Sequence, residues 1–585
     1  MEETYRQRTK QFLDRVGALD RRSAALANGR LLFFLAAAGL AVAVTFNRLP
    51  SWAWAIAGAC FVVFLVLATW HSRVIEAERR AKASAELNQR GLDRLQGKWH
   101  AFTARGDEYL QGDHLYTPDL DVFGQGSLFQ RLNETATKAG EKLLASWLLA
   151  PAESAEEIVS RQAAAKELST LTDFRQALLT EARVASEKRA DPSRFIAWVE
   201  GPAMLSGIRW ARPLAYVLPV LTLTLGLLAQ YADLPPLYAG LSFFAQLGVA
   251  AITWAACSKF YSTLTDGEGG FVRYEQTFAA VHAQKFSDAR LSRLREKAGA
   301  SQKLARFGRL FSFAELRSSG QYHAVINVLL LWDLHWLFRL EDWRVREGRD
   351  VRAWFEALAE LEALAAIGTW AAERPADAFP VIAAEDAVFD AKGLGHPLLE
   401  KPVVNDVSLS RQLWVITGSN MSGKTTLLRA VGLNTVMALA GMPVCAAELK
   451  LSQLRPLTLM RVKDSLERGV SYFYAEVQRV KAVLDAARAA RGRALVLLDE
   501  LLMGTNTKER QIASKRLLEL LRDAGAIGGV TTHDLMLTET QGVRNVHFRD
   551  DVRDGQMVFD YRLREGVVET TNALRLLEAA GVPLG

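Results

Sequence analysis

Four apolar runs stand out against the otherwise mixed pattern of hydrophobic and polar positions. The first two, 31–46 and 52–70, are separated only by NRLPS, and the second two, 213–230 and 237–257, only by YADLPP. About 20 apolar residues are needed to cross a bilayer, and the first run is slightly short of this. Because such links allow only a reversal of the chain, the pattern predicts two transmembrane helical hairpins. Buried core helices are the alternative interpretation of each run.

Basic residues collect on the outer flanks of both predicted hairpins. They are Arg21, Arg22 and Arg30 before the first hairpin, Arg73, Arg79, Arg80 and Lys82 after it, Arg209 and Arg212 before the second, and Lys259 after it. Since positively charged flanks stay on the cytoplasmic side, both chain ends and the large polar segments are expected in the cytoplasm. The polar N-terminal stretch has no signal-peptide cleavage site. We therefore expect a multi-pass protein of the inner cell membrane.

The segments outside the hairpins have the spacing of amphipathic helices. Apolar residues recur three and four positions apart over 113–205 and again over 261–380, which predicts the two parts of a helical core. An N-terminal unit, 1–112, contains the first hairpin, and its charged stretch 74–112 predicts a solvated helix leaving the membrane. The second hairpin occupies 206–260.

One apolar run inside the second helical part has a different character. Ala324–Phe338 carries Asn327, Asp333 and His335, and it is too short and too polar for a fifth span. It predicts a buried or interfacial helix, in which His335 is a satisfied core residue rather than a ligand.

The pattern changes again near 374–380. Over 381–585, short β-like runs alternate with helices, which is typical of an α/β domain with a largely parallel sheet. The predicted fold class is therefore multidomain α and α/β, with two transmembrane helical hairpins, an all-α core and lever region, and a C-terminal α/β domain.

Composition adds few constraints. The chain has 585 residues, enough for several domains, and 50% of them are hydrophobic. Cys60, Cys257 and Cys445 lie far apart, so they form neither a disulfide framework nor a metal-binding set. The net charge of +6 is compatible with nucleic acid or anionic lipid and identifies neither.

A glycine-bounded loop follows the apolar run 413–416 and precedes a helical pattern. Its residues are Gly418, Ser419, Asn420, Met421, Ser422, Gly423, Lys424 and Thr425, followed by Thr426. A strand, such a loop and a helix form the order of a phosphate-binding P-loop. The glycines let backbone N–H groups face a polyphosphate, Lys424 can reach its β- and γ-phosphates, and the Thr425 hydroxyl can bind Mg²⁺. We therefore expect a nucleotide site here.

Two further strands end in polar residues that suit the same site. The stretch 494–500 (ALVLLDE) has the form of a Walker B strand, in which Asp499 holds Mg²⁺ and Glu500 orients or deprotonates the attacking water. A buried strand ending in two solvated acids is the alternative. The stretch 530–533 ends in His533, and in P-loop ATPases of the ABC type a histidine there contacts the γ-phosphate. Lys424, Glu500 and His533 are thus the candidate catalytic residues.

Ordered motifs in the last third of the chain carry a family resemblance. They are GHP at 395–397, TGSNMSGKTTLLR at 417–429, DSLERGVSYFYAE at 464–476, DELLMGTNT at 499–507, TTHD at 531–534 and AAGVP at 579–583. In that order they resemble RHP, TGPNMGGKST, a signature segment with the pattern S-x-F-x-x-E, DEIGRGTST, ATHY and LAGVP of the MutS family of DNA mismatch-repair proteins. A weaker resemblance to the family's helical core and lever helices extends upstream.

The resemblance implies an ATPase that holds its nucleotide between two subunits. Ser471 would then act in trans, with its hydroxyl and the nearby backbone N–H groups completing the γ-phosphate cage. ATP, Mg²⁺, a second copy of the chain and DNA are the implied cofactors and partners. Opening and closing of the dimer would be transmitted through the lever helices.

Two departures from the family bear on DNA. The first hairpin stands where mismatch-repair MutS has the domain that inserts a Phe-x-Glu wedge, and Phe313-Ala314-Glu315 lies elsewhere in the chain. The second hairpin interrupts the helical core about where the family carries its DNA clamp. No basic stripe interleaved with aromatic residues replaces these contacts in the sequence.

Together these patterns predict a membrane-anchored, MutS-like, ABC-type ATPase that binds and hydrolyses ATP as a homodimer. DNA ranks first as the partner to which ATP hydrolysis is coupled, by resemblance to the family. An ATP-driven membrane coupler ranks second, although spans almost free of charged residues argue against a path for ions or polar substrates. A nucleotide-controlled scaffold ranks third.

Overall fold

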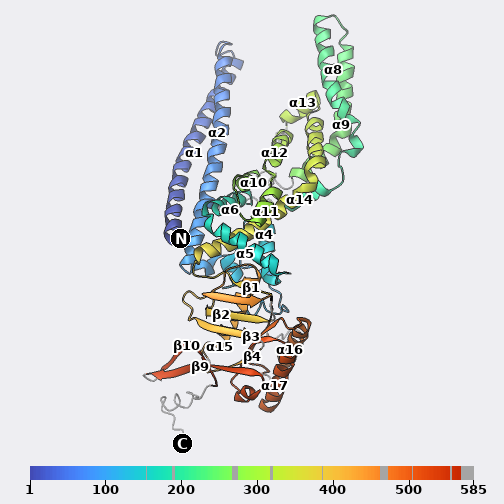
Figure 1. Ribbon diagram of the computed structural model, residues 1–585. Coiled ribbons are helices and arrows are strands. Elements are labelled where there is room, and N and C mark those ends of the chain that lie inside the picture. Colours follow the sequence, from blue (N-terminus) through green and yellow to red (C-terminus); the bar gives the residue numbers. More distant parts are fainter. Residues whose placement is uncertain are drawn as a thin grey trace.

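The computed structural model describes residues 1–152, 154–186, 192–265, 274–315, 321–384, 387–410, 412–419, 421–460, 472–502, 505–553 and 556–567. Within these ranges the protein is mostly helical, and its strands gather toward the C-terminus (Figure 1). Two helical pairs extend to the same side, a helical core lies below them, and two β-sheets lie below the core. The mostly helical multidomain architecture with a C-terminal α/β region is confirmed.

Two pairs of long helices carry the apolar runs. They are α1 (Glu2–Thr45) with α2 (Ala53–Leu95), and α8 (Ala211–Tyr231) with α9 (Leu237–Thr265). By length and composition, all four are apolar enough to cross a membrane. Their outer surfaces are apolar, since Leu32, Phe46 and Phe244 are 66%, 73% and 68% exposed. Exposed apolar patches of this extent mark a surface that meets lipid or another protein.

The helical core is built from short helices around one long helix. They are α3 (Leu128–Leu132), α4 (Lys138–Leu149), α5 (Ala155–Thr170), α6 (Thr172–Ser186), α7 (Pro192–Glu200), α10 (Tyr274–Ala283), α11 (Ala289–Lys297), α12 (Ser301–Glu315), α13 (Gln321–Leu330) and the long α14 (Trp332–Glu373). Local sequence sets several helix starts, because Thr137, Ser154 and Asp288 each accept a hydrogen bond from the backbone N–H three residues on. α14 contacts the second hairpin at one end and leads into the sheets at the other (Figure 1).

The lower half of α2 is not the solvated helix that its charge predicts. The helix continues without a break from the apolar run, and Ala81 and Ala85 are buried where it packs against α6. Its charges are accommodated by ion pairs, and Arg80 Nε lies 2.9 Å from Glu181 Oε1. The prediction was wrong because the sequence shows the charges of α2 but not their partners on α6.

The apolar run Ala324–Phe338 is split in the structure. α13 ends at Leu330, and Leu331 adopts a left-handed conformation with φ 48° before α14 begins. The His335 ring packs edge-on against Tyr216, with ring centroids 4.4 Å apart. His335 therefore packs as a structural residue, as predicted.

In the described part of the chain, ten strands form two sheets. They are β1 (Val381–Ala383), β2 (Val388–Leu394), β3 (Asn405–Ser410), β4 (Leu413–Thr417), β5 (Glu448–Ser452), β6 (Arg455–Leu459), β7 (Ala494–Asp499), β8 (Ile527–Thr531), β9 (Val543–Arg553) and β10 (Gln556–Glu565). The larger sheet has the order β10-β9-β4-β8-β7-β6 and is parallel except for β10. This is the largely parallel sheet that the pattern predicts. The smaller sheet, β1-β5-β2-β3, is mixed and was not predicted, because β5 pairs with β1 and β2 only after the chain has passed through β4 and the following helix.

Helices cover both faces of the larger sheet. α15 (Lys424–Leu439) packs with Trp414 and Ile416 on the face toward the helical core, whereas Leu413 and Val415 pack with α16 (Tyr472–Ala489) and α17 (Thr507–Asp523) on the other. α15 is buried over almost its whole length, between β6, β7 and β8 and helix α4. The loop before α15 is therefore fixed by a strand and a helix that both lie in the core.

The short 3₁₀ helices complete the described elements. They are η1 (Lys98–Ala101), η2 (Asp107–Tyr109), η3 (Ser206–Ile208) and η7 (Leu535–Glu539).

Candidate functional site

The glycine-bounded loop turns between the end of β4 and the start of α15. Gly418 and Gly423 have φ of 146° and 107°, values that side-chain-bearing residues rarely adopt. A Cβ atom on Gly418 would also come within 3.0 Å of the Phe548 carbonyl oxygen of β9. The two glycines thus allow the tight turn, and the N-terminus of α15 faces the loop with the positive end of its dipole.

Lys424 is folded into the concave side of this loop. Its Nζ donates hydrogen bonds to the carbonyl oxygens of Gly418 at 2.9 Å and Ser419 at 2.8 Å, and it lies 3.3 Å from His533 Nε2. Burial lowers the pKa of Lys424, and nearby carboxylates, first that of Glu500, oppose this shift. The ammonium group is therefore held at the centre of the loop by carbonyl groups that an anion can replace.

The remaining loop residues differ in exposure. Met421 has φ 67° and is 81% exposed at the tip. Ser422 is buried, and its hydroxyl has no hydrogen-bond partner among the described residues. Thr426 lines a cavity beside the loop. Asn420 of the loop and Ser471 of the signature segment lie outside the described residues.

Thr425 and Asp499 meet across the ends of α15 and β7. Thr425 Oγ1 donates to Asp499 Oδ2 at 2.8 Å, and Thr531 donates to the other carboxylate oxygen. No group of three or more His, Cys, Asp or Glu side chains suited to a metal occurs in the described part of the chain. One carboxylate with one hydroxyl fits Mg²⁺, which takes few protein ligands and completes its shell with water and substrate phosphates.

Glu500 stands immediately after β7 in a left-handed conformation with φ 49°. Its N–H donates to the Thr531 carbonyl at 3.2 Å, and its Oε1 lies 2.9 Å from His533 Nε2. The Glu500 and His533 side chains are 33% and 43% exposed, so both face accessible space. Non-glycine residues in such conformations cluster at functional sites, where the surrounding structure holds them in place.

The structure thus brings together residues from three separate segments of the chain. Lys424 and Thr425 come from the start of α15, Asp499 and Glu500 from the end of β7, and His533 from just after β8. Because β4, β7 and β8 are parallel neighbours in the order β4-β8-β7, their carboxyl ends meet at one edge of the sheet. Ligands of open α/β sheets bind at this edge.

A cavity of about 310 Å³ adjoins the loop and was not found by sequence reasoning. The Tyr561 ring reaches over Gly423, where an added Cβ would lie 3.2 Å from Tyr561 Cδ1. Asn405 fixes this position, because its amide donates to the Tyr561 carbonyl at 3.0 Å and accepts from the Leu563 N–H at 2.8 Å. A flat aromatic face beside this glycine-bounded loop could stack on a nucleobase.

Glu476 supports the turn that carries Glu500. It is 2% exposed, and its Oε1 accepts a hydrogen bond from the Leu502 N–H at 2.6 Å. Leu502 has φ 57°, so the hydrogen bond holds a second left-handed residue of this turn. In the sequence, Glu476 could have been identified by its position at the end of the signature segment. For Tyr561 and Asn405 no local motif gave a signal.

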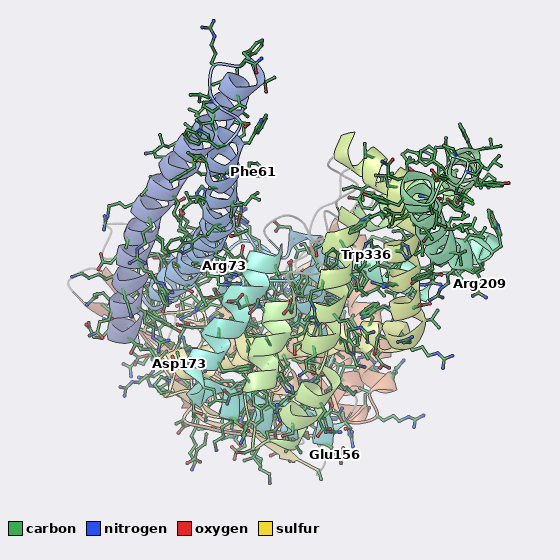
Figure 2. All side chains as sticks on the ribbon, turned by 90° about the horizontal axis from the view of Figure 1, so that it is seen from above. Phe61, Arg73, Glu156, Asp173, Arg209 and Trp336 are labelled. Carbon is green, nitrogen blue, oxygen red and sulfur yellow. The ribbon has the colours of Figure 1, made fainter. Side chains whose placement is uncertain are left out.

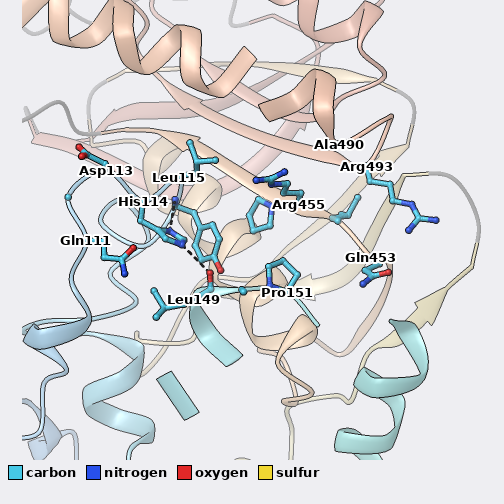
Figure 3. A pocket seen from close by; sticks show the side chains of 15 residues that line it. Gln111, Asp113, His114, Leu115, Leu149, Pro151, Gln453, Arg455, Ala490 and Arg493 are labelled. Carbon is cyan, nitrogen blue, oxygen red and sulfur yellow. Dashed lines mark hydrogen bonds between the residues drawn. The ribbon is translucent and has the colours of Figure 1, made fainter. Parts of the chain in front are cut away.

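A larger cavity lies elsewhere, between the helical core and the edge strand β6 (Figure 3). It measures about 960 Å³, and its lining includes His114, Pro151, Arg455 and Arg493. His114 Nε2 lies 3.0 Å from the Leu149 carbonyl, and burial lowers the pKa of its imidazole. None of the predicted nucleotide-site residues lines this cavity, so its size does not make it the site of the chemistry.

Comparison with known proteins gives the same family for two separate segments. The family model of MutS domain V matches residues 414–585, and that of MutS domain III matches residues 114–204. The DNA mismatch repair protein MutS of Natronomonas pharaonis is 34% identical over 239 residues, which cover 39% of this chain and 27% of that protein. The DNA mismatch repair protein MutS of Chloroflexus aurantiacus is 32% identical over 249 residues, which cover 40% of this chain and 25% of that protein.

Endonuclease MutS2 of Thermomicrobium roseum is 35% identical over 198 residues, which cover 32% of this chain and 24% of that protein. The chain therefore spans only about a quarter of the length of these curated relatives.

Proposed function

Since this chain is a member of the MutS family, as its motifs predicted, we propose that it is a membrane-anchored ATPase. In this proposal it binds and hydrolyses ATP as a homodimer and couples this cycle to DNA. The observation that carries the proposal is the convergence of Lys424, Thr425, Asp499, Glu500 and His533 at one edge of the parallel sheet. The sheet order, with the loop after β4 and the acids after the more distant β7, supports a P-loop ATPase of the ABC type.

Each residue has a distinct part in the proposed hydrolysis. Lys424 exchanges the carbonyls of Gly418 and Ser419 for the β- and γ-phosphates, so the loop opens around the nucleotide. Thr425 and Asp499 would hold Mg²⁺, which would neutralise charge on the phosphates. Glu500 accepts the proton of the water that attacks the γ-phosphorus, ADP leaves, and His533 orients Glu500 and contacts the transferred group.

A second copy of the chain would cover the open side of the site. The Glu500 and His533 side chains are 33% and 43% exposed and Met421 is 81% exposed, so one copy of the chain does not cover them. Catalytic phosphate chemistry is strengthened when water is excluded from the site. We infer that the partner's signature segment, with Ser471, provides this cover in the ATP-bound dimer.

The base of ATP is expected to stack on Tyr561. Tyr561→Ala should weaken ATP binding about 5- to 150-fold, because base–aromatic stacking contributes about 1–3 kcal/mol. Tyr561→Phe should bind ATP like the wild type, since it keeps the aromatic face. Titration with tripolyphosphate, which has no base, is the matched control and should give equal affinities for all three proteins. An unchanged ATP affinity in Tyr561→Ala would place the base elsewhere.

The membrane part of the proposal is supported by the outer surfaces of the two hairpins. Four helices have the length and apolar composition of spans, and their large apolar side chains are exposed. The basic flanks then orient the protein with the ATPase domain and both termini in the cytoplasm, at the inner cell membrane.

ATP turnover measured with and without DNA tests whether the ATPase is coupled to DNA. The full chain in nanodiscs is assayed alone and with homoduplex, mismatched and branched DNA. In the control variant Glu500→Gln, ATP turnover that is due to this protein must disappear. DNA-stimulated turnover with a preference among these substrates is the expected result. Turnover that no DNA changes, yet that Glu500→Gln abolishes, would overturn the DNA part. It would favour a membrane coupler, for which the continuous α14 between the second hairpin and the sheets is the supporting observation.

A further inference from the structure

Helix α13 has its polar residues inside and its apolar residues outside. His323 and Asn327, one helical turn apart, are 4% and 6% exposed, whereas Val325 and Leu329 are 59% and 53% exposed. A helix at the surface of a water-soluble protein has the opposite arrangement. Outward-facing Val and Leu with inward-facing His and Asn are expected where the surroundings of the helix are hydrocarbon.

The polar groups on the inner side satisfy one another. His323 Nε2 lies 2.7 Å from Asp333 Oδ1, and Asn327 Oδ1 accepts a hydrogen bond from the Asp333 N–H at 3.0 Å. At the break between α13 and α14, the Leu331 N–H donates to the Asn327 carbonyl at 2.8 Å, and Leu331 is 1% exposed. Irregular backbone at membrane depth is tolerated only when its polar groups are paired and covered in this way.

α13 is docked halfway along the second hairpin. The amide of Gln246, which is 0% exposed, donates to the carbonyl oxygen of Val328 in α13. The Thr222 hydroxyl donates to the same Gln246 side chain at 3.1 Å. Thr222 and Gln246 lie near the middle of the apolar runs 213–230 and 237–257. The contact therefore lies near the middle of the hydrocarbon layer that these runs would cross.

The position of the start of α14 independently indicates the same depth in the hydrocarbon layer. Asp342 pairs with Arg212, which flanks the second hairpin, at 3.0 Å between Oδ1 and Nη1. Trp332 lies about 15 Å further along the helix, since an α-helix rises ~1.5 Å per residue. This is about half of the ~30 Å hydrocarbon thickness. Over 332–338 no charged side chain is exposed.

An aromatic and basic boundary lies at the lower end of this apolar part. Trp336 stacks on Phe313 of α12 with ring centroids 4.3 Å apart, and the Arg339 guanidinium lies 4.7 Å from the Trp336 ring centroid. Seen from above, Trp336 and Arg209 lie on the side of the molecule that carries the second hairpin, away from Phe61 of the first (Figure 2). Trp and Arg together are typical of the membrane–water interface.

We propose that α13 and the first two turns of α14 enter the hydrocarbon layer from the cytoplasmic side without crossing it, with lipid acyl chains as their partner. The proposal rests on the proposed membrane anchoring through α8 and α9. A helix of ten residues is about 15 Å long, so α13 cannot span a bilayer. In this proposal the run 324–338, which the sequence predicts as a buried or interfacial helix, lies deeper than an interface.

Nitroxide labels at single cysteines test the depth in the full chain. Cys60, Cys257 and Cys445 are first replaced by Ala, and the cysteine-free protein is checked for ATP turnover equal to that of the wild type. Val325→Cys and Leu329→Cys are labelled in liposomes, and collision rates with oxygen and with a water-soluble nickel chelate are compared. Phe244→Cys, 68% exposed on the proposed span α9, is the lipid reference, and Val345→Cys, 64% exposed lower on α14, is the aqueous reference.

The oxygen-to-nickel ratio at 325 and 329 should match that at 244 and exceed that at 345 several-fold. Ratios at 325 and 329 that match 345, while 244 still shows lipid, would overturn the proposal and leave the two hairpins in place. An aqueous ratio at 244 as well would instead overturn the membrane anchoring itself, and the proposal with it.

Discussion

Replacement of Glu500 by Gln should lower the rate of ATP hydrolysis by about 10²- to 10⁴-fold, the usual contribution of a general base. The amide has nearly the same size as the carboxylate but cannot accept the proton of the attacking water. Lys424, Thr425 and Asp499 are untouched, so the affinity for ATP with Mg²⁺ should stay close to that of the wild type. Steady-state turnover and equilibrium ATP binding, measured on the same nanodisc preparation, give the two quantities.

Two further variants decide how this result is interpreted. Glu519→Gln, on the outer part of α17 where Glu519 pairs with Arg516 at 2.9 Å, removes a carboxylate of the same domain and should leave turnover unchanged. His533→Ala should lower turnover without abolishing ATP binding, because it removes the partner that lies 2.9 Å from Glu500 Oε1. Normal turnover in Glu500→Gln would contradict its role as the base, and loss of ATP binding would show that the change disturbs the turn after β7.

The residues of the candidate site could be picked out from the sequence because they belong to local motifs. Lys424 and Thr425 follow the glycine loop directly, and Asp499 and Glu500 end a short hydrophobic strand, so each role depends on neighbours only a few residues away. That these motifs meet follows from the parallel sheet, whose alternating strands and helices are also visible locally.

The other parts depend on contacts between segments that are distant in sequence. Tyr561 reaches the loop because Asn405, far upstream, holds its backbone, and no pattern around either residue shows this. The mixed four-stranded sheet requires β5 to return to β1 and β2. The inward-facing polar side of α13 is recognised only when Asp333 and Gln246 are known to lie against it. Sequence periodicity shows that a helix has two faces, but not what each face meets.

A buried charge cluster joins the first hairpin to the helical core, and Glu134 is at its centre. Its carboxylate pairs with Arg94, with Arg90 at 3.0 Å and with Arg183 at 2.7 Å, and it is about 1% exposed. Arg94 also binds Glu373 at the end of α14 at 2.6 Å. Burial alone would raise the pKa of Glu134, but the three arginines outweigh it and lower the pKa to about 2.

Replacement of Glu134 by Gln should destabilise the folded protein by about 3–5 kcal/mol at neutral pH, because it leaves buried guanidinium groups without their counter-charge. Thermal or denaturant unfolding in detergent, followed by circular dichroism, measures the loss. Glu200→Gln is the matched control, since Glu200 pairs with Arg352 at an exposed position and such pairs contribute little. An equal loss in the two variants would show that the cluster has no special role.

The pH dependence gives a second and sharper test of the same cluster. A carboxylate whose pKa is lowered in the folded state stabilises the fold above its unfolded pKa, near 4.5, and this contribution is lost as the pH falls toward about 2. The stability difference between wild type and Glu134→Gln should therefore be largest above pH 4.5 and shrink steadily below it. A difference that stays constant over this range would mean that the variant disturbs packing rather than charge. A stability difference that shrinks with falling pH would show that ionised Glu134 stabilises the packing of α2, and with it the first hairpin, against the helical core that contains α14.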